Sequence, residues 1–318
     1  MNTLYIVVPC YNEQETIEYS AKRLLEKVED LVSHSRVSTD SRILFVNDGS
    51  TDQTWDLIKR LHKSSVAFCG LDLSCNKGQQ NALMAGLMYA KEYADVVVTL
   101  DADLQDDIDV IDKMLDKFDE GCDVVYGVRS SRRKDSFFKR VTAEAFYRFM
   151  NFLGAKTIFN HADFRLMSRR AVNALEQFEE VNLFLRGIVP LIGYNTAIVE
   201  YERKRRKAGE TKYPLRKMVS FALDGITSFS IRPLRIITLL GVVILFVSLI
   251  MLVYALVSFF TDAVKGWSSI LISIWGIGGL TLFSIGVVGE YVGKTYLESK
   301  HRPKYFVKEI IDEKKKSQ

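Results

Sequence analysis

Acidic residues follow an apolar run in the segment Asp95–Asp107, whose sequence is DVVVTLDADLQDD. The run Val96–Leu100 has the β-branched composition and the length of a buried strand in a parallel sheet. Asp101 and Asp103 stand at its carboxyl end, where open α/β sheets bind their ligands. Carboxylates this close repel one another, and hard oxygen ligands suit Mg²⁺ or Mn²⁺ bound together with substrate phosphates. The segment therefore predicts a divalent-metal site, with a solvated acidic turn as the alternative.

Two other expected strands end in polar clusters, Pro9–Glu15 (PCYNEQE) and Asn47–Asp52 (NDGSTD). The carboxyl ends of neighbouring parallel strands meet at one edge of a sheet, so the three clusters should converge. The chain has no GxGxxG turn and no GxxxxGK[ST] loop, which argues against a Rossmann dinucleotide site and a P-loop. A nucleotide held by carboxylates and a metal fits better. Asp48 could accept hydrogen bonds from a base or ribose, or it could serve the turn Asp48–Gly49.

Basic residues gather in two stretches, although the net charge of the chain is only +4. Residues 129–140 carry six basic residues and one acidic one, and residues 201–217 carry eight and two. Phosphate ligands, anionic lipid headgroups and nucleic acid are the partners that such stretches can bind.

Strand and helix patterns alternate along residues 1–200. These elements must position the three polar clusters at the strand ends. Expected strands are 4–8, 42–46, 66–73, 96–100 and 124–128; expected helices are 13–31, 78–91, 108–118 and one that ends at 61. This alternation predicts an α/β fold, a doubly wound and mainly parallel sheet with helices on both faces. The four cysteines and four histidines have neither disulfide nor zinc spacing, which fits reduced thiols in a cytosol-facing domain.

The last third of the chain contains two long uncharged stretches, 236–261 and 266–289. A helix of 26 residues would extend for about 39 Å, more than the ~30 Å of a bilayer's hydrocarbon core. We therefore expect a hairpin of two transmembrane helices. Arg232 and Arg235 precede it and Lys294, Lys300 and Arg302 follow, so the positive-inside rule places both termini in the cytoplasm. Glycines in the second stretch could pack on the first helix of the hairpin or on a second copy of the chain.

Several motifs together resemble a known family. VVPCYNEQE, VNDGSTD, NKGQQNAL and DADLQDD, in this order, look like the inverting family 2 glycosyltransferases with the GT-A nucleotide-sugar fold. GVRSSR, HADFRLMSRR and RKAGETKYPLRK, followed by two spans, resemble the polyprenyl-phosphate branch, which includes dolichyl-phosphate mannose synthases and bacterial undecaprenyl-phosphate glucosyltransferases. The resemblance covers nearly the whole chain.

The resemblance implies a role for each matching residue. The nucleotide of the donor would be bound by Pro9, Tyr11, Glu13, Asp48, Lys77, Gln79 and Asp101. The metal, Mg²⁺ or Mn²⁺, would be held by Asp101, Asp103 and Gln105. The acceptor phosphate would be bound by Arg129, Arg165, Arg206 and Lys212. Asp103, Arg129 and Asp163 would take part in catalysis.

The acceptor phosphate would be a nucleophile without help. Its second pKa is about 6, so it is largely dianionic at neutral pH. A strong general base is dispensable, and Asp163 could orient the acceptor, take a residual proton, or form a structural ion pair with an arginine. The resemblance favours UDP-glucose as donor and undecaprenyl phosphate as acceptor; UDP-N-acetylglucosamine, GDP-mannose and an aminopentose donor remain alternatives.

These expectations divide the chain into four parts. Residues 1–213 form a cytoplasmic GT-A domain, 214–232 an interfacial amphipathic segment, 233–293 the transmembrane hairpin and 294–318 a cytoplasmic tail. Expected partners are a nucleotide sugar, a polyprenyl phosphate, membrane lipids and further copies in a dimer or tetramer, but not nucleic acid. A non-catalytic membrane adapter is the alternative from another class; a processive polysaccharide synthase is disfavoured because a QxxRW element is missing.

Overall fold

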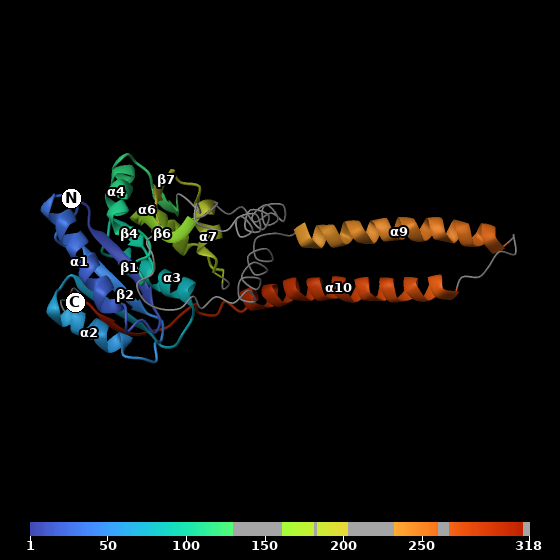
Figure 1. Cartoon of the computed structure of the whole chain (residues 1–318), viewed down its shortest axis with the longest axis horizontal. Coiled ribbons are helices and arrows are strands. Elements are labelled where there is room, and N and C mark those ends of the chain that lie inside the picture. The colour runs from blue at the N-terminus through green and yellow to red at the C-terminus, as the bar shows by residue number, and fades with distance from the viewer. Residues whose placement is uncertain (130–160, 181–182, 203–231, 260–266, 314–318) are drawn as a thin grey trace. The chain divides into compact units, whose positions relative to one another are not determined.

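The computed structural model describes residues 1–129, 161–180, 183–202, 232–259 and 267–313 (Figure 1). The chain divides into two compact units. The first comprises Met1–Glu144, Thr157–Lys212 and Arg302–Gln318, and the second comprises Ala145–Lys156 and Tyr213–His301. Each unit is described by itself.

An eight-stranded mixed sheet forms the centre of the first unit. Its strands are β1 (Leu4–Cys10), β2 (Arg42–Asn47), β3 (Phe68–Leu73), β4 (Val96–Thr99), β5 (Val124–Arg129), β6 (His161–Ser168), β7 (Thr196–Tyr201) and β8 (Val307–Ile311). They lie in the order β7-β5-β6-β4-β1-β2-β3-β8. Strands β4, β1, β2 and β3 are mutually parallel neighbours, whereas β6 and β8 run antiparallel to theirs. The carboxyl ends of four parallel strands therefore meet at one edge.

Helices cover both faces of this sheet. They are α1 (Ile17–Ser33), α2 (Thr54–Ser64), α3 (Gln79–Ala90), α4 (Ile111–Asp119) and α6 (Arg169–Glu176), with the short α7 (Leu185–Ile188) and the 3-10 turns η1 (Ile108–Val110) and η2 (Val189–Ile192). The side chains of Leu4, Ile6 and Val8 alternate along β1 into a core shared with α1, α2 and α4. The opposite face packs on α3.

Helix α3 approaches the sheet closely because Gly86 has no side chain. A Cβ atom at this position would collide with the side chains of Val7 and Val46. The first turn of α3, which begins at Gln79, lies next to the carboxyl end of β4, because Gln79 Nε2 donates to Asp101 Oδ1 (2.7 Å). Helix α1 starts at Ile17 and not at the predicted Glu13. The backbone N–H of Glu13 donates to Thr54 Oγ1 (2.9 Å), and its carbonyl accepts the N–H of Ile17 (3.0 Å).

Strand β8 lies within the stretch 294–318 that we predicted to be a tail. It pairs antiparallel with β3 and so covers that edge of the sheet. Trp55 Nε1 donates to Glu309 (3.0 Å), the Tyr89 hydroxyl donates to Asp312 (2.7 Å), and Lys308 lies 3.1 Å from the buried Asp72. The segment VKEII has two adjacent charged residues and no alternation of polar and apolar residues, so this long-range pairing could not be predicted from the sequence.

The second unit contains two long helices, α9 (Arg232–Phe259) and α10 (Trp267–Ser299), which pack against each other. The less exposed residues of α10 recur at intervals of three and four, the spacing of a helix–helix seam: Leu280, Ser284, Val287, Tyr291, Lys294 and Glu298. Among the described residues, one helical stretch, Gly276–Ser299, is long and apolar enough to cross a membrane, and α9 adds the shorter apolar stretch Leu234–Ile244. The two-span topology stays a prediction.

Candidate active site

The loops after β1 and β2 are bonded to each other, as the sequence predicts. Asn12 has a left-handed backbone with φ of 54°, and its side-chain oxygen accepts the backbone N–H of Thr51 (2.9 Å). Its own N–H donates to Ser50 Oγ (3.0 Å). A non-glycine residue with positive φ is uncommon and persists where its surroundings fix it. The polar clusters PCYNEQE and NDGSTD thus form one wall of the candidate site.

Asp48 joins this wall to the loop before α3. Its buried carboxylate accepts the backbone N–H groups of Lys77 (2.7 Å) and Gly78 (2.9 Å). Burial raises the pKa of Asp48, and these two hydrogen bonds oppose the rise. Gly49 has φ of 62° and packs on the backbone of Cys75, so a side chain there would collide. The geometry shows a loop-fixing role for Asp48; contact with a base or ribose stays a prediction.

Asp101 lies at the carboxyl end of β4, at the centre of a group of acidic residues. Its Oδ1 accepts a hydrogen bond from Gln79 Nε2 (2.7 Å), at the start of α3. Loss of solvation, followed by repulsion from Asp163, Asp106 and Asp103, raises the pKa of Asp101 to about 7, and Arg186 opposes the rise. Such a carboxylate destabilises the fold when it is charged and gains most from a cation.

The loop that follows Asp101 holds the other predicted metal ligands. Leu104 has φ of 44°, a strained backbone for a non-glycine residue, and the Asp103 carboxylate accepts the N–H of Gln105 (3.2 Å). Asp103 is partly exposed, and Gln105 is buried. In the described part of the chain, no three His, Cys, Asp or Glu residues form a cage that would hold a metal unaided. One or two carboxylates together with substrate phosphates are the usual way to hold Mg²⁺.

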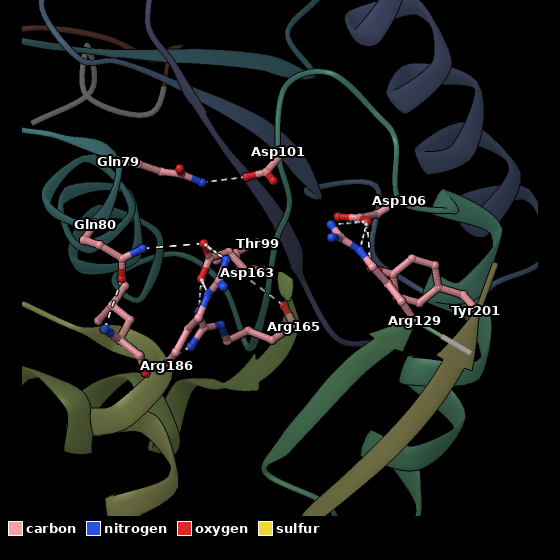
Figure 2. A network of polar contacts seen from close by, with 11 residues as sticks. Gln79, Gln80, Thr99, Asp101, Asp106, Arg129, Asp163, Arg165, Arg186 and Tyr201 are labelled. Atoms are coloured by element: carbon pink, nitrogen blue, oxygen red, sulfur yellow. Dashed lines mark hydrogen bonds and ion pairs between the residues drawn. The ribbon is translucent and has the colours of Figure 1, made fainter. Parts of the chain in front are cut away.

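Arg129 is part of a second cluster, which the sequence did not reveal (Figure 2). Its Nε and one Nη lie 3.3 and 3.1 Å from Asp106 Oδ1, and the Tyr201 hydroxyl donates to the same oxygen (2.6 Å). Strands β5 and β7 supply the arginine and the tyrosine, and the metal loop supplies the carboxylate. Arg129 thus lies beside the acidic strand end, and its contact with a phosphate stays a prediction.

Asp163, at the start of β6, accepts hydrogen bonds from two arginines (Figure 2). Arg165 donates to Oδ1 (2.8 Å), and Arg186 donates to Oδ1 (3.1 Å) and Oδ2 (3.0 Å). Gln80 Nε2 lies 3.5 Å from Oδ2, and its oxygen accepts the N–H of Leu185 (3.0 Å). Of the roles that the sequence left open for Asp163, the geometry shows the ion pair.

The burial of Arg165 counts against its predicted contact with the acceptor phosphate. Only 1% of the residue is exposed, and its second donor group binds the carbonyl of Leu185 (3.3 Å). Burial lowers the pKa of Arg165, an effect that Asp163 opposes. The solvent-accessible arginine of this cluster is Arg186, which we did not predict because α7 carries no motif around it.

The remaining predicted residues fall into two groups. Pro9 and Glu13 are partly buried along the joined loops, and Tyr11, Lys77 and Gln79 are exposed around them. Arg206, Lys212 and the amphipathic segment 214–232, except Arg232, lie outside the described residues.

The arrangement defines a nucleotide-sugar transferase fold of the GT-A type, with an acidic strand end and two arginine–aspartate pairs at the carboxyl edge of the sheet. Residues 5–175 match the family model for glycosyl transferase family 2. The chain belongs to this family and is a glycosyltransferase.

Relatives are similar to the chain over nearly its full length. The prophage bactoprenol glucosyl transferase homolog of Escherichia coli is 42% identical over 96% of this chain and 98% of its own, and the bactoprenol glucosyl transferase of Shigella phage SfV is 41% identical over 95% and 97%. An uncharacterized glycosyltransferase of Bacillus subtilis, YkoT, is 53% identical over 96% and 90%. The crystal structure of glucosyl-3-phosphoglycerate synthase from Mycobacterium tuberculosis covers 72% of this chain and 79% of its own, with 17% identity and a TM-score of 0.47.

Proposed function

We propose that the chain transfers glucose from UDP-glucose to undecaprenyl phosphate, with inversion at the anomeric carbon, at the cytoplasmic face of the membrane. The product would be a lipid-linked sugar that serves as a donor in cell-envelope glycosylation. The observation that carries the proposal is the group of carboxylates around Asp101, because their mutual repulsion favours a bound cation. The names of the bactoprenol glucosyl transferase relatives support the lipid acceptor and the glucosyl group.

The residues at the end of β4 fit a divalent metal. Asp101, Asp103 and Gln105 offer hard oxygen atoms. Repulsion from Asp163, Asp106 and Asp103 disfavours the charged form of Asp101 unless positive charge is bound there. A bound Mg²⁺ or Mn²⁺ would neutralise charge on the diphosphate leaving group. The joined loops that contain Pro9, Tyr11, Glu13 and Asp48 would enclose the nucleotide.

The chemistry needs little proton transfer. A lone pair on an oxygen of the phosphate dianion forms the new bond to the anomeric carbon, the bond from that carbon to the diphosphate breaks, and its electron pair leaves on UDP. No proton moves when the acceptor enters as the dianion. Both oxygens of Asp163 already accept hydrogen bonds from guanidinium groups, which agrees with a mechanism that requires no base.

The acceptor must be bound where its lipid lies. We propose that α9 and α10 cross the membrane, that both termini are cytoplasmic, and that Arg206 and Lys212 bind the lipid phosphate. The arginine fork recognises phosphate by paired hydrogen bonds. Segment 214–232 would lie at the headgroups.

A transfer assay tests the proposal. Detergent-solubilised chain is incubated with undecaprenyl phosphate, Mg²⁺ or Mn²⁺, and in turn UDP-glucose, UDP-N-acetylglucosamine and GDP-mannose, and the glycolipid is identified by mass. We expect glucosyl transfer that chelation by EDTA abolishes. Turnover with another donor only would correct the sugar, and failure with every donor in the presence of lipid phosphate would favour a non-catalytic adapter.

Substitution in the metal loop supplies the matched control. We expect Asp103→Ala to lower turnover at least about a thousand-fold, because the diphosphate charge would no longer be neutralised. Asp109→Ala changes an exposed aspartate in the next element, η1, and should leave turnover within about twofold of the unsubstituted chain. Full activity of Asp103→Ala would refute the metal assignment.

A further inference from the structure

Arg186, on the short helix α7, forms an ion pair with Asp163 through two hydrogen bonds. Its Nε and one Nη donate to the two oxygens of Asp163 at 3.1 and 3.0 Å, which is the bidentate fork of guanidinium on carboxylate. Asp163 is itself fixed by Arg165, and Gln80 links the N–H of Leu185 to the same group. Arg186 therefore has a defined orientation before any substrate binds.

The two arginines of this cluster differ in exposure. Side-chain exposure is 34% for Arg186 and 2% for Arg165. A solvent-borne ligand can reach the first and not the second. Arg165 is a second charged partner of Asp163, so the charge of this carboxylate is not balanced by Arg186 alone.

Arg186 also lies close to the acidic strand end. Its positive charge acts on the Asp101 carboxylate, opposing the repulsion from Asp163, Asp106 and Asp103. Figure 2 shows Asp163 and its arginines below Asp101 and the Asp106–Arg129 pair to its right. The reacting phosphates, brought to Asp101 in the proposed function, would arrive between these two pairs.

We propose that Arg186 binds the phosphoryl oxygens of a reacting phosphate and that Asp163 is its positioning residue, not a proton acceptor. The inference rests on the proposed function and adds a residue to it. The guanidinium of Arg186 is already oriented by one carboxylate and is accessible to solvent. Binding a second anion would therefore cost little side-chain conformational entropy. The phosphate is that of the nucleoside diphosphate or that of the lipid acceptor.

Binding measurements distinguish these two sources. Full-length chain in detergent is titrated with UDP plus Mn²⁺, with uridine, and with farnesyl phosphate, each by calorimetry. If Arg186 contacts the donor, Arg186→Gln should weaken UDP binding about 10- to 100-fold and leave uridine binding unchanged. If it contacts the acceptor, the same loss should appear with farnesyl phosphate. Unchanged affinity for both phosphates would overturn the proposal.

The chain offers a matched control at the other end of β6. Arg170 forms the same kind of fork on Asp123, next to Ser168 and far along the strand from Asp163. Arg170→Gln should bind both phosphates as tightly as the unsubstituted chain. Equal losses in Arg170→Gln and Arg186→Gln would show a general effect on the fold and would refute a specific phosphate contact.

Kinetics then test the role of Asp163. Arg186→Lys, which keeps a point charge, should recover part of the affinity lost in Arg186→Gln. Asp163→Asn should raise KM for the same phosphate that Arg186→Gln affects, and adding Arg186→Gln to it should cost less than about twofold more, because the two residues act as a unit. A loss in kcat at unchanged phosphate affinity in Asp163→Asn, fully additive with Arg186→Gln, would show that Asp163 acts by itself.

If the unsubstituted chain neither binds UDP nor forms glycolipid, the proposed function fails. If it does both while the Arg186 variants match it, only the present inference fails.

Discussion

Asp101 has an environment that costs the fold stability. Three carboxylates and loss of solvation act on it, with Gln79 and Arg186 as partial compensation. Residues arranged in this way are typical of sites where a ligand supplies the missing charge. In the metal-free protein, this repulsion should lower the free energy of unfolding, which can be measured without an activity assay.

We expect Asp101→Asn to stabilise the metal-free fold at alkaline pH. The pKa of Asp101 is raised from 3.8 to about 7, so its favourable contribution is complete below pH ~4 and is lost as the pH rises through about 7. Asparagine does not ionise, so the variant does not lose this stability as the pH rises. At about 1.4 kcal/mol per pKa unit, a rise of about three units corresponds to ~4 kcal/mol as an upper bound. Because solvent reaches part of Asp101, the free energy of unfolding of the variant should exceed that of the unsubstituted chain by roughly 1–3 kcal/mol at pH 8 and by less at pH 5.

Urea unfolding of the full chain in EDTA measures this difference. Trp55 is the only tryptophan of the first unit, so Trp267→Phe and Trp275→Phe make its fluorescence a specific reporter. Asp109→Asn, on an exposed carboxylate, is the control and should change stability by less than about 0.5 kcal/mol. A stability difference that is equal at pH 5 and pH 8 would contradict the raised pKa.

The sheet and its site could be predicted to different extents. Apolar runs such as Val96–Leu100 gave the parallel strands, and their polar ends gave the converging loops, because both depend on local sequence. An ion pair of Asp163 with an arginine was among the predicted roles, but Arg186 as its partner and the Arg129–Asp106 pair could not be predicted, since each pair is 23 residues apart along the chain and has no motif spacing. Strand β8 was missed for the same reason, because its partner β3 lies more than two hundred residues earlier in the chain.

Strand β8 should be required for a stable first unit. It supplies backbone hydrogen bonds to the β3 edge and places Asp312 on the half-buried Tyr89 hydroxyl. Removing residues 307–318 should lower stability by about 2 kcal/mol or more and increase aggregation, because the edge of β3 becomes unpaired. Tyr89→Phe, which keeps the strand and removes one bond, should cost about 1 kcal/mol. Circular dichroism during urea unfolding and light scattering measure both; equal values for the truncated and full chains would show β8 to be dispensable.

At the scale of the whole molecule, a long apolar hairpin interrupts the sequence of the catalytic unit. Residues 302–318 belong to the same unit as residues 1–144, while α9 and α10 form the other. Deletion of everything after residue 231 would therefore remove β8 as well as the hairpin, and its effect on activity would be ambiguous.

Replacing residues 232–301 with a flexible Gly/Ser linker separates the two effects. Because β8 is retained, the variant should still transfer glucose to farnesyl phosphate in solution, within about tenfold of the full chain. Transfer to undecaprenyl phosphate in vesicles should fall at least a hundred-fold, because the proposed membrane anchor is lost. Equal activity of the two chains on vesicles would refute an anchoring role for α9 and α10.

The position of β8 in the sequence also sets an order of events during synthesis. The ribosome completes α9 and α10 before it releases residues 307–311, so the β3 edge of the sheet stays unpaired while the hairpin is being made. Domains fold as their chain emerges, and an unpaired strand edge is prone to wrong association. The last step of folding the catalytic sheet therefore follows synthesis of both apolar helices, and a chain that stalls within the hairpin leaves an incomplete enzyme.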